Sequence, residues 1–140
     1  MNEPSASEYS AENAPQLTPE LALANLQSSD LSLRYYAAWW LGKFRVSHPD
    51  VVDALIAALE DEADRTEMGG YPLRRNAARA LGKLGDAKAI PGLIKSLECH
   101  DFYVREAAAQ SLQKLRDKTA APALIKMLDG GVAQAVQVMG

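Results

Sequence analysis

The pattern Arg-x-x-Ala-Ala-x-x-Leu occurs three times in this chain of 140 residues. The copies span Arg34–Leu41, Arg74–Leu81 and Arg105–Leu112, and an apolar run follows each of them. Within each copy the apolar residues recur three or four positions apart, which is the spacing of one helix face. A fixed period of helix pairs is typical of an α-solenoid, in which each repeat packs only against its neighbours. The repeats therefore predict an all-α solenoid.

Helix start and stop signals give the expected repeat boundaries. About three full repeats are expected, near residues 30–60, 71–98 and 101–129, in a domain that covers residues 17–140. A short helix after Thr18 is expected to be a half-repeat that caps the N-terminal end. Residues 1–16 are rich in Ser, Glu, Asn and Pro, which predicts a disordered tail. Gly42, Gly82 and Gly85 are expected near the turns inside the repeats.

Arginines recur in register at Arg34, Arg74 and Arg105. One interpretation is a row of sites for anionic groups. A structural role is favoured, because residues four apart face each other on a helix. Asp30 and Asp101 stand four residues before two of these arginines, so we expect the pairs Asp30–Arg34 and Asp101–Arg105.

Composition excludes several classes of function. The net charge is −3, from 15 basic and 18 acidic residues, which argues against nucleic acid as the main partner. Cys99 is the single cysteine, so no intrachain disulfide forms and a reducing, cytoplasmic location is expected. No apolar run reaches the ~20 residues that span a bilayer, so no membrane insertion is expected. Two histidines and one cysteine without ligand spacing predict neither a metal site nor a bound cofactor.

Four aromatic residues within six positions break the repeat pattern. The other two repeats carry polar residues where Tyr35 and Trp39 stand, so these two side chains are expected to face away from the core. Exposed aromatics four residues apart favour a binding surface. Tyr36 and Trp40 are expected to pack beneath the tail or the N-terminal cap, with binding as the alternative for Trp40.

An acidic insertion at residues 61–70 separates the first repeat from the second. Insertions in solenoids emerge as loops on one face, often the binding face, although a solvated connector explains this one equally well. Tyr71, Arg75, Asn76 and Arg79 follow it and are specific to the second repeat. They form the best candidate patch for recognising an anion, with a solvated face as the alternative.

Few residues suggest catalysis. Cys99 and His100 are adjacent, so their side chains diverge on a helix and do not pair as nucleophile and base. Glu98 and Asp101 are weak candidates for an acid, because charges at helix ends more often cap the helix or face solvent. From residue chemistry alone the chain is a binding module.

Three segments carry a family resemblance: Leu33–Arg45, Gly69–Ala78 and Leu97–Glu106. They resemble the E-type subunits of the lyases that attach phycocyanobilin to the phycocyanin α subunit. The repeats likewise resemble HEAT-like repeats of the phycobilisome-lyase type. A closely similar relative attaches phycoviolobilin to phycoerythrocyanin and isomerises the bilin, and the residues leave both alternatives open.

The resemblance implies a heterodimer with an F-type subunit. The complex would bind a linear tetrapyrrole, phycocyanobilin, as substrate and join it through a thioether to a cysteine of the phycocyanin α subunit. Tyr71, Asn76 and Trp40 remain candidates for bilin or partner binding. The other implied roles are stacking or partner contact for Tyr35 and Trp39, propionate binding for Arg75 and Arg79, and pyrrole N–H contact for Glu98 or Asp101.

Members of that family continue through further repeats. After Asp129 the chain lacks the expected entry to another repeat, so a truncated form is expected, active only with its F partner. The rival hypothesis is a non-catalytic interaction scaffold of HEAT-like repeats, either a truncated lyase subunit or a factor in phycobilisome turnover.

Overall fold

The computed structural model describes residues 16–62, 65–66, 69–118 and 129–130. Every regular element in these residues is helical. The elements are α1 (Pro19–Asn25), α2 (Leu31–Lys43), α3 (Val51–Ala58), α4 (Pro72–Leu84), the short 3-10 helix η2 (Ala87–Ala89), α5 (Ile90–Ser96) and α6 (Phe102–Lys118).

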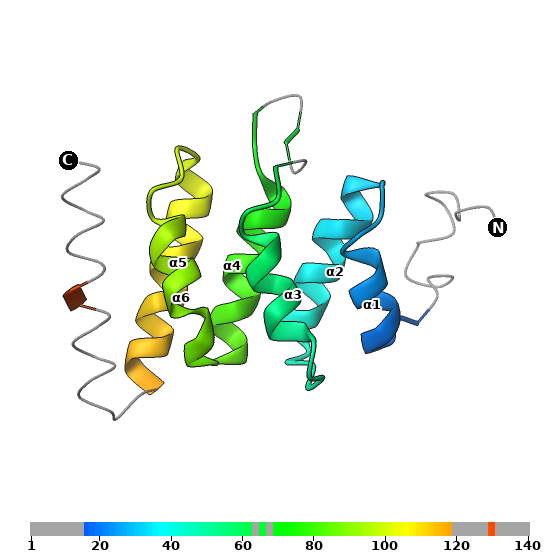
Figure 1. Ribbon diagram of the computed structural model, residues 1–140, viewed down its shortest axis with the longest axis horizontal. Coiled ribbons are helices and arrows are strands. Elements are labelled where there is room, and N and C mark those ends of the chain that lie inside the picture. Colours follow the sequence, from blue (N-terminus) through cyan, green and yellow to red (C-terminus); the bar gives the residue numbers. More distant parts are fainter. Residues whose placement is uncertain (1–15, 63–64, 67–68, 119–128, 131–140) are drawn as a thin grey trace.

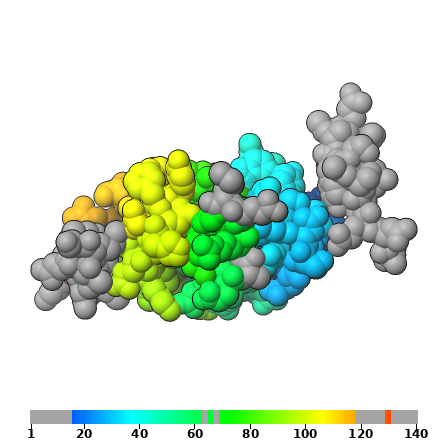
Figure 2. Space-filling model, turned by 90° about the horizontal axis from the view of Figure 1, so that it is seen from above, coloured from blue at the N-terminus to red at the C-terminus, as the bar shows by residue number. Residues whose placement is uncertain are grey.

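The helices form two layers, with α2, α4 and α6 in one and α1, α3 and α5 in the other (Figure 1). In the first layer α2 packs on α4 and α4 on α6, while α1 packs on both α2 and α3. Seen from above, the described segments follow one another along the long axis in chain order (Figure 2). The predicted all-α solenoid is therefore confirmed, with α1 in the place of the half-repeat. The tail before Gln16 and the second helix expected in the third repeat lie outside the described residues.

Side-chain caps begin three of the helices. The Oγ1 atom of Thr18 accepts a hydrogen bond of 3.1 Å from the N–H of Leu21, at the start of α1. Asp30 accepts from the N–H of Ser32 at 2.9 Å, and Asp101 accepts from that of Tyr103 at 2.8 Å. These bonds satisfy N–H groups that have no partner within the helix, which is worth about 1 kcal/mol each.

The core lies between the two layers. Leu41, Leu81 and Leu112 occupy the same position in successive repeats and are buried. Leu55 and Leu93, from α3 and α5, close the core from the second layer. Burying a leucine side chain stabilises a fold by about 1.5–3 kcal/mol, so this repeated position holds the stack together.

The predicted place of the glycines near the turns inside the repeats is confirmed, because Gly42 and Gly82 lie in the last turns of α2 and α4 and Gly85 follows α4. Gly42 is a buried residue of α2, and a Cβ atom added to it would lie 2.6 Å from the Cβ of Ala80 in α4. Gly82 in α4 has the same relation to Ser111 in α6, again at 2.6 Å. Each glycine therefore marks the closest approach of two neighbouring helices. Gly85 ends α4 in the left-handed conformation, with φ of 74°.

The recurring arginines join the layers, although their expected partners are wrong. Arg34 forms a salt bridge of 3.2 Å with Asp61, just beyond α3. Arg105 donates to the carbonyl groups of Cys99 and His100, at 3.0 and 3.1 Å. The capping aspartates do not reach these arginines, because their carboxylates turn back to N–H groups of their own helices. The structural role holds, and each arginine fixes the end of a second-layer helix.

Two of the four clustered aromatics are placed opposite to expectation. Tyr35 is half-buried against the core, and its carbonyl accepts a 2.9 Å hydrogen bond from Asn76. Tyr36 is 48% exposed, and its ring lies 5.4 Å from that of Trp39. Trp39 is exposed and Trp40 half-buried, as predicted. In α4 and α6 the position of Tyr36 faces the preceding first-layer helix. Among the described residues no first-layer helix precedes α2, so Tyr36 is left exposed.

Candidate functional site

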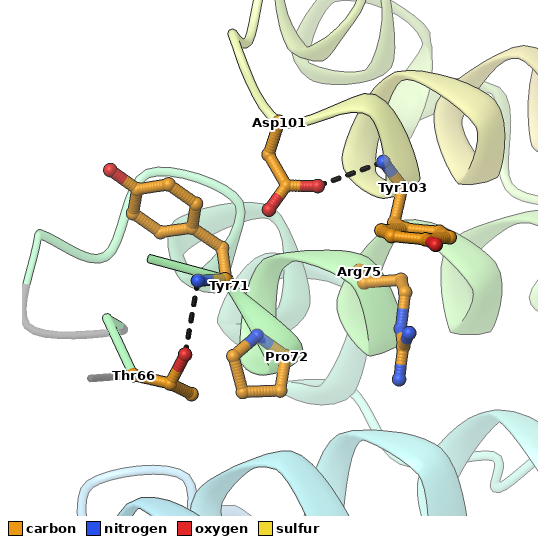
Figure 3. A pocket seen from close by; sticks show the side chains of 7 residues that line it. Thr66, Tyr71, Pro72, Arg75, Asp101 and Tyr103 are labelled. Atoms are coloured by element: carbon orange, nitrogen blue, oxygen red, sulfur yellow. Dashed lines mark hydrogen bonds between the residues drawn. The ribbon is translucent and has the colours of Figure 1, made fainter. Parts of the chain in front are cut away.

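A pocket opens where α4 and α6 begin, beside the end of the inserted segment (Figure 3). Its volume is about 160 Å³. The residues that line it are Thr66, Gly70, Tyr71, Pro72, Arg75, Asp101 and Tyr103. They come from two consecutive repeats and from the insertion between the first repeat and the second, so the solenoid stacking itself builds the pocket.

The end of the insertion forms one wall of this pocket. The Oγ1 atom of Thr66 accepts from the N–H of Gly70 at 3.0 Å, and the N–H of Thr66 donates to the carbonyl of Gly70 at 3.0 Å. Gly69 between them has φ of 84°, a conformation that side chains disfavour. These bonds hold the segment next to Tyr71 and Pro72, where α4 starts.

The two aromatic residues of the lining, Tyr71 and Tyr103, each contact an arginine. The guanidinium of Arg74 lies 4.5 Å from the ring centre of Tyr71, and that of Arg75 lies 6.0 Å from the ring of Tyr103. The rings of His100 and Tyr71 form an edge contact with an angle of 80° between their planes, and the Nε2 atom of His100 is 3.4 Å from the Tyr71 hydroxyl oxygen. Such contacts hold flat rings and planar cations in fixed orientation.

Phe102 and Tyr103 are the most exposed large apolar side chains of the described residues beside Phe44, at 56% and 60%. Their rings lie 5.5 Å apart on the first turn of α6. Sequence reasoning assigned neither of them a site role. The signal was available, because Phe102 occupies the position of Tyr71 one repeat later. Adjacent exposed aromatics are frequent anchors of binding surfaces.

The electrostatics of the pocket favour an anionic group near Arg75. The Nε atom of Arg75 is buried and has no hydrogen-bond partner among the described residues. The pocket also lies at the N-terminal ends of α4 and α6, where helix dipoles place partial positive charge. Asp101 supplies the one carboxylate in the lining, and its Oδ1 atom is engaged in capping α6.

The structure brings together three of the residues that the sequence singled out: Tyr71, Arg75 and Asp101. Asn76 instead binds the backbone of α2. Arg79 lies one turn further along α4 and is exposed. Glu98, Tyr35, Trp39 and Trp40 do not line the pocket either.

Metal-binding groups are sparse in the part of the chain that is described. No three His, Cys, Asp or Glu side chains gather there closely enough to hold a metal ion. Cys99 is partly buried and is not a pocket residue. Among the same residues, no helix has the length and apolar character needed to cross a bilayer.

Family comparisons agree with this architecture. A family described as HEAT repeats matches residues 70–139, which is half of the chain. The chain belongs to the HEAT-repeat family. A second family, described as the PBS lyase HEAT-like repeat, matches residues 33–61. This HEAT-repeat chain thus carries matches on both sides of the inserted segment.

Curated relatives extend the similarity over the whole HEAT-repeat chain. It is 82% identical over 140 residues to "Phycocyanobilin lyase subunit alpha" of Nostoc sp. PCC 7120, covering 100% of this chain and 51% of that protein. The protein of the same name from Thermosynechococcus vestitus is 65% identical over 131 residues, covering 89% and 48%. "Bilin biosynthesis protein PecE" of the same Nostoc strain is 54% identical over 87 residues, covering 62% and 34%. The chain spans about half the length of the first two relatives.

A solved structure also matches, the complex of CpcE and CpcF of phycocyanin lyase from Nostoc sp. PCC 7120. The TM-score is 0.72 at 82% identity, over 98% of this HEAT-repeat chain and 52% of that chain. The resemblance to E-type lyase subunits is therefore confirmed.

Proposed function

We propose that the chain acts as part of an E-type subunit of a heterodimeric bilin lyase. In this role it binds phycocyanobilin with an F-type partner and promotes its attachment to a cysteine of the phycocyanin α subunit. The observation that carries the proposal is 82% identity, across the full length of the chain, to a protein named phycocyanobilin lyase subunit alpha. The matching solved structure is a complex with CpcF, which supports the F-type partner.

Similarity to two proteins of one organism favours phycocyanobilin over phycoviolobilin. The chain is 82% identical to the phycocyanobilin lyase subunit of the Nostoc strain and 54% identical to its PecE protein. Greater identity to the first therefore supports the same pigment and acceptor here.

The pocket suits one end of a flat, conjugated tetrapyrrole with two propionate groups. A guanidinium binds a carboxylate through charge-assisted hydrogen bonds, and Arg75 has a buried Nε atom that no described group engages. The exposed ring of Tyr103, beside Arg75, can cover a pyrrole face. A volume of about 160 Å³ is below the ~300–1,000 Å³ of ligand pockets. The rest of the pigment would therefore lie on the surface of Phe102 and Tyr103 and against the partner subunit.

Asp101 is a better candidate than Glu98 for contact with the pyrrole N–H groups, because Asp101 lines the pocket and Glu98 does not. A carboxylate that accepts from these groups favours their protonated form, which makes the ethylidene carbon more electrophilic. The acceptor thiol then adds across the ethylidene double bond. Sulfur bonds to one carbon and the thiol proton ends on the tetrapyrrole, so the step needs no oxidant.

A chimera tests this function. The matching 140 residues of the Nostoc relative are replaced by this chain, and the chimera is co-expressed with CpcF, the phycocyanin α subunit and a source of phycocyanobilin. We expect a covalently coloured α subunit, detected by zinc-induced fluorescence on a denaturing gel. The intact Nostoc protein serves as positive control.

A chimera that co-purifies with CpcF but leaves the α subunit colourless would exclude the lyase function and favour the non-catalytic scaffold. A coloured product with the absorption of phycoviolobilin would instead favour the alternative, a subunit of a phycoviolobilin lyase and isomerase.

A further inference from the structure

The layer of α2, α4 and α6 carries basic residues that form no salt bridge among the described residues, in addition to Arg34, Arg74 and Arg116, which do. α2 and α4 contain six basic residues and no acidic one, in a chain whose net charge is −3. Among the described residues, no carboxylate forms a salt bridge with Lys43, Lys83 or Lys114. The same holds for Arg45 and Arg79, which flank them.

Lys43, Lys83 and Lys114 occupy one position in three successive repeats, and we call them the lysine row. Close contacts between α2 and α4, and between α4 and α6, hold their backbones side by side. Packed helices stand about 8–10 Å apart, which sets the spacing between neighbouring members of the row.

The pKa of Lys83 reflects the charges of its neighbours. Burial lowers its pKa, and the charges of four basic neighbours on α2, α4 and α6 or just beyond lower it further. Those neighbours are Lys114, Lys43, Arg45 and Arg79, and no acidic group offsets them. Lys83, the middle member of the lysine row, therefore lies in a positive field.

The second layer shows the opposite arrangement. Lys88 of η2 forms a salt bridge of 2.6 Å with Asp53 of α3, and Lys95 of α5 pairs with Glu60. Hydrogen bonding to these carboxylates raises the pKa values of both lysines. Charges of the second layer are thus paired between neighbouring repeats, whereas those of the lysine row are left for another molecule.

Favourable interaction with helix dipoles explains the positions of only two of the three lysines. Lys43 and Lys83 lie in the last turns of α2 and α4, where a positive charge is stabilising. Lys114 lies a full turn before the end of α6. The helix dipole also does not explain why none of the three lysines forms a salt bridge with a carboxylate among the described residues. Trp39 adds an aromatic anchor to the row, because it is 37% exposed and its ring is 4.9 Å from the Nζ atom of Lys43. Aromatic residues are enriched in protein–protein interfaces.

We propose that the lysine row is a docking surface for an acidic helix of a partner protein, which lies across α2, α4 and α6. Acidic residues seven positions apart on a helix stand about 10.5 Å apart along its axis, close to the spacing of the row. A protein helix fits better than nucleic acid, whose charge of one per about 1.7 Å would also meet the acidic groups of this chain. The inference does not depend on the lyase function.

Two helical peptides of identical composition test the proposal on the full chain. One carries Glu at three positions seven residues apart, and the other carries the same residues in scrambled order. We expect the ordered peptide to bind at least about tenfold more tightly, with affinity that falls as salt is added. Equal affinity for the two peptides would overturn the proposal, as would tighter binding of a DNA duplex or of anionic vesicles.

Matched variants locate the peptide on the surface. The triple change Lys43→Gln, Lys83→Gln and Lys114→Gln should remove the preference for the ordered peptide. The double change Lys88→Gln and Lys95→Gln, in the other layer, should keep it. Loss of the preference in both variants, with helical content unchanged by circular dichroism, would show general charge attraction and contradict a defined site.

Discussion

Gly82 faces Ser111 across the α4–α6 interface with no room for a side chain between them. The Oγ atom of Ser111 donates a 2.5 Å hydrogen bond to the carbonyl of Ala78, so this serine is fixed as well as buried. Gly42 and Ala80 repeat the contact one helix earlier. The spacing of the first layer, and with it the geometry of the pocket and of the lysine row, depends on these two glycines.

Gly82→Ala tests that dependence. The new methyl group would overlap the Cβ of Ser111, and overpacking of this kind costs about 1–3 kcal/mol despite the higher helix propensity of alanine. Urea unfolding should show a lower midpoint with an unchanged slope. Gly130→Ala is the matched control, since a Cβ atom at Gly130 meets nothing within 4 Å. Equal stability of the two variants would refute the close-packing role.

Arg75→Ala should weaken phycocyanobilin binding, because Arg75 lines the pocket and is placed to bind a propionate. A charge-assisted hydrogen bond of this kind is worth about 1.5–3 kcal/mol, which corresponds to a loss of affinity of about tenfold or more. Absorption titration of the chimera–CpcF complex measures it. Arg79→Ala on the exposed side of α4 is the control and should change affinity little. The propionate assignment would fail if the two variants behaved alike.

Lys83→Met should stabilise the chain at neutral pH. The pKa of Lys83 is lowered from 10.5, so its charged form opposes folding. That penalty is complete below the lowered pKa and disappears as the pH rises through 10.5. A gain of about 0.5 kcal/mol is expected at pH 7, shrinking at pH 10 and in high salt. Lys95→Met, which breaks the pair with Glu60, should not stabilise. A gain of equal size at both pH values would contradict this origin.

Asp30→Ala should destabilise the start of α2 by about 1 kcal/mol at pH 7. Hydrogen bonds from the side chain and then the backbone N–H of Ser32 lower the pKa of Asp30 below its usual value. The contribution of its charged form is therefore present above the ordinary pKa and lost as the pH falls through the lowered one. In thermal unfolding, the difference in melting temperature between the variant and the wild type should become smaller as the pH falls from 7 to 3. Asp30→Asn, which can still cap, should lose less at pH 7.

The helices and their caps could be predicted from the sequence, because capping residues and apolar spacing are local features. Thr18, Asp30 and Asp101 cap the helices they precede, and the apolar period placed Leu41 and Leu81 in the core. It failed where an interaction joins distant segments. Arg34 forms a hydrogen bond with Asp61, 27 positions away, and a helical period carries no information about such a pair.

The sequence predicted only part of the candidate site, because the site also depends on contacts between different repeats. Comparison of the repeats singled out Tyr71 and Arg75, which line the pocket, but predicted that Tyr36, which is 48% exposed, packs beneath the tail or the cap. An alignment of repeats treats every repeat as having a neighbour on both sides, and α2 has no first-layer helix before it among the described residues. Tyr103 belongs to the next repeat, so its contribution to the pocket follows only from the stacking of α6 on α4.

The most direct measurement of the central claim is the rate at which purified components form the thioether. The chimera–CpcF complex, phycocyanobilin and the pigment-free phycocyanin α subunit are mixed, and covalent pigment on the α subunit is followed over time. We expect a rate well above the spontaneous reaction without lyase, the phycocyanobilin absorption spectrum in the product, and a marked loss of rate with Arg75→Ala. A complex that forms normally but adds nothing to the spontaneous rate would contradict the account.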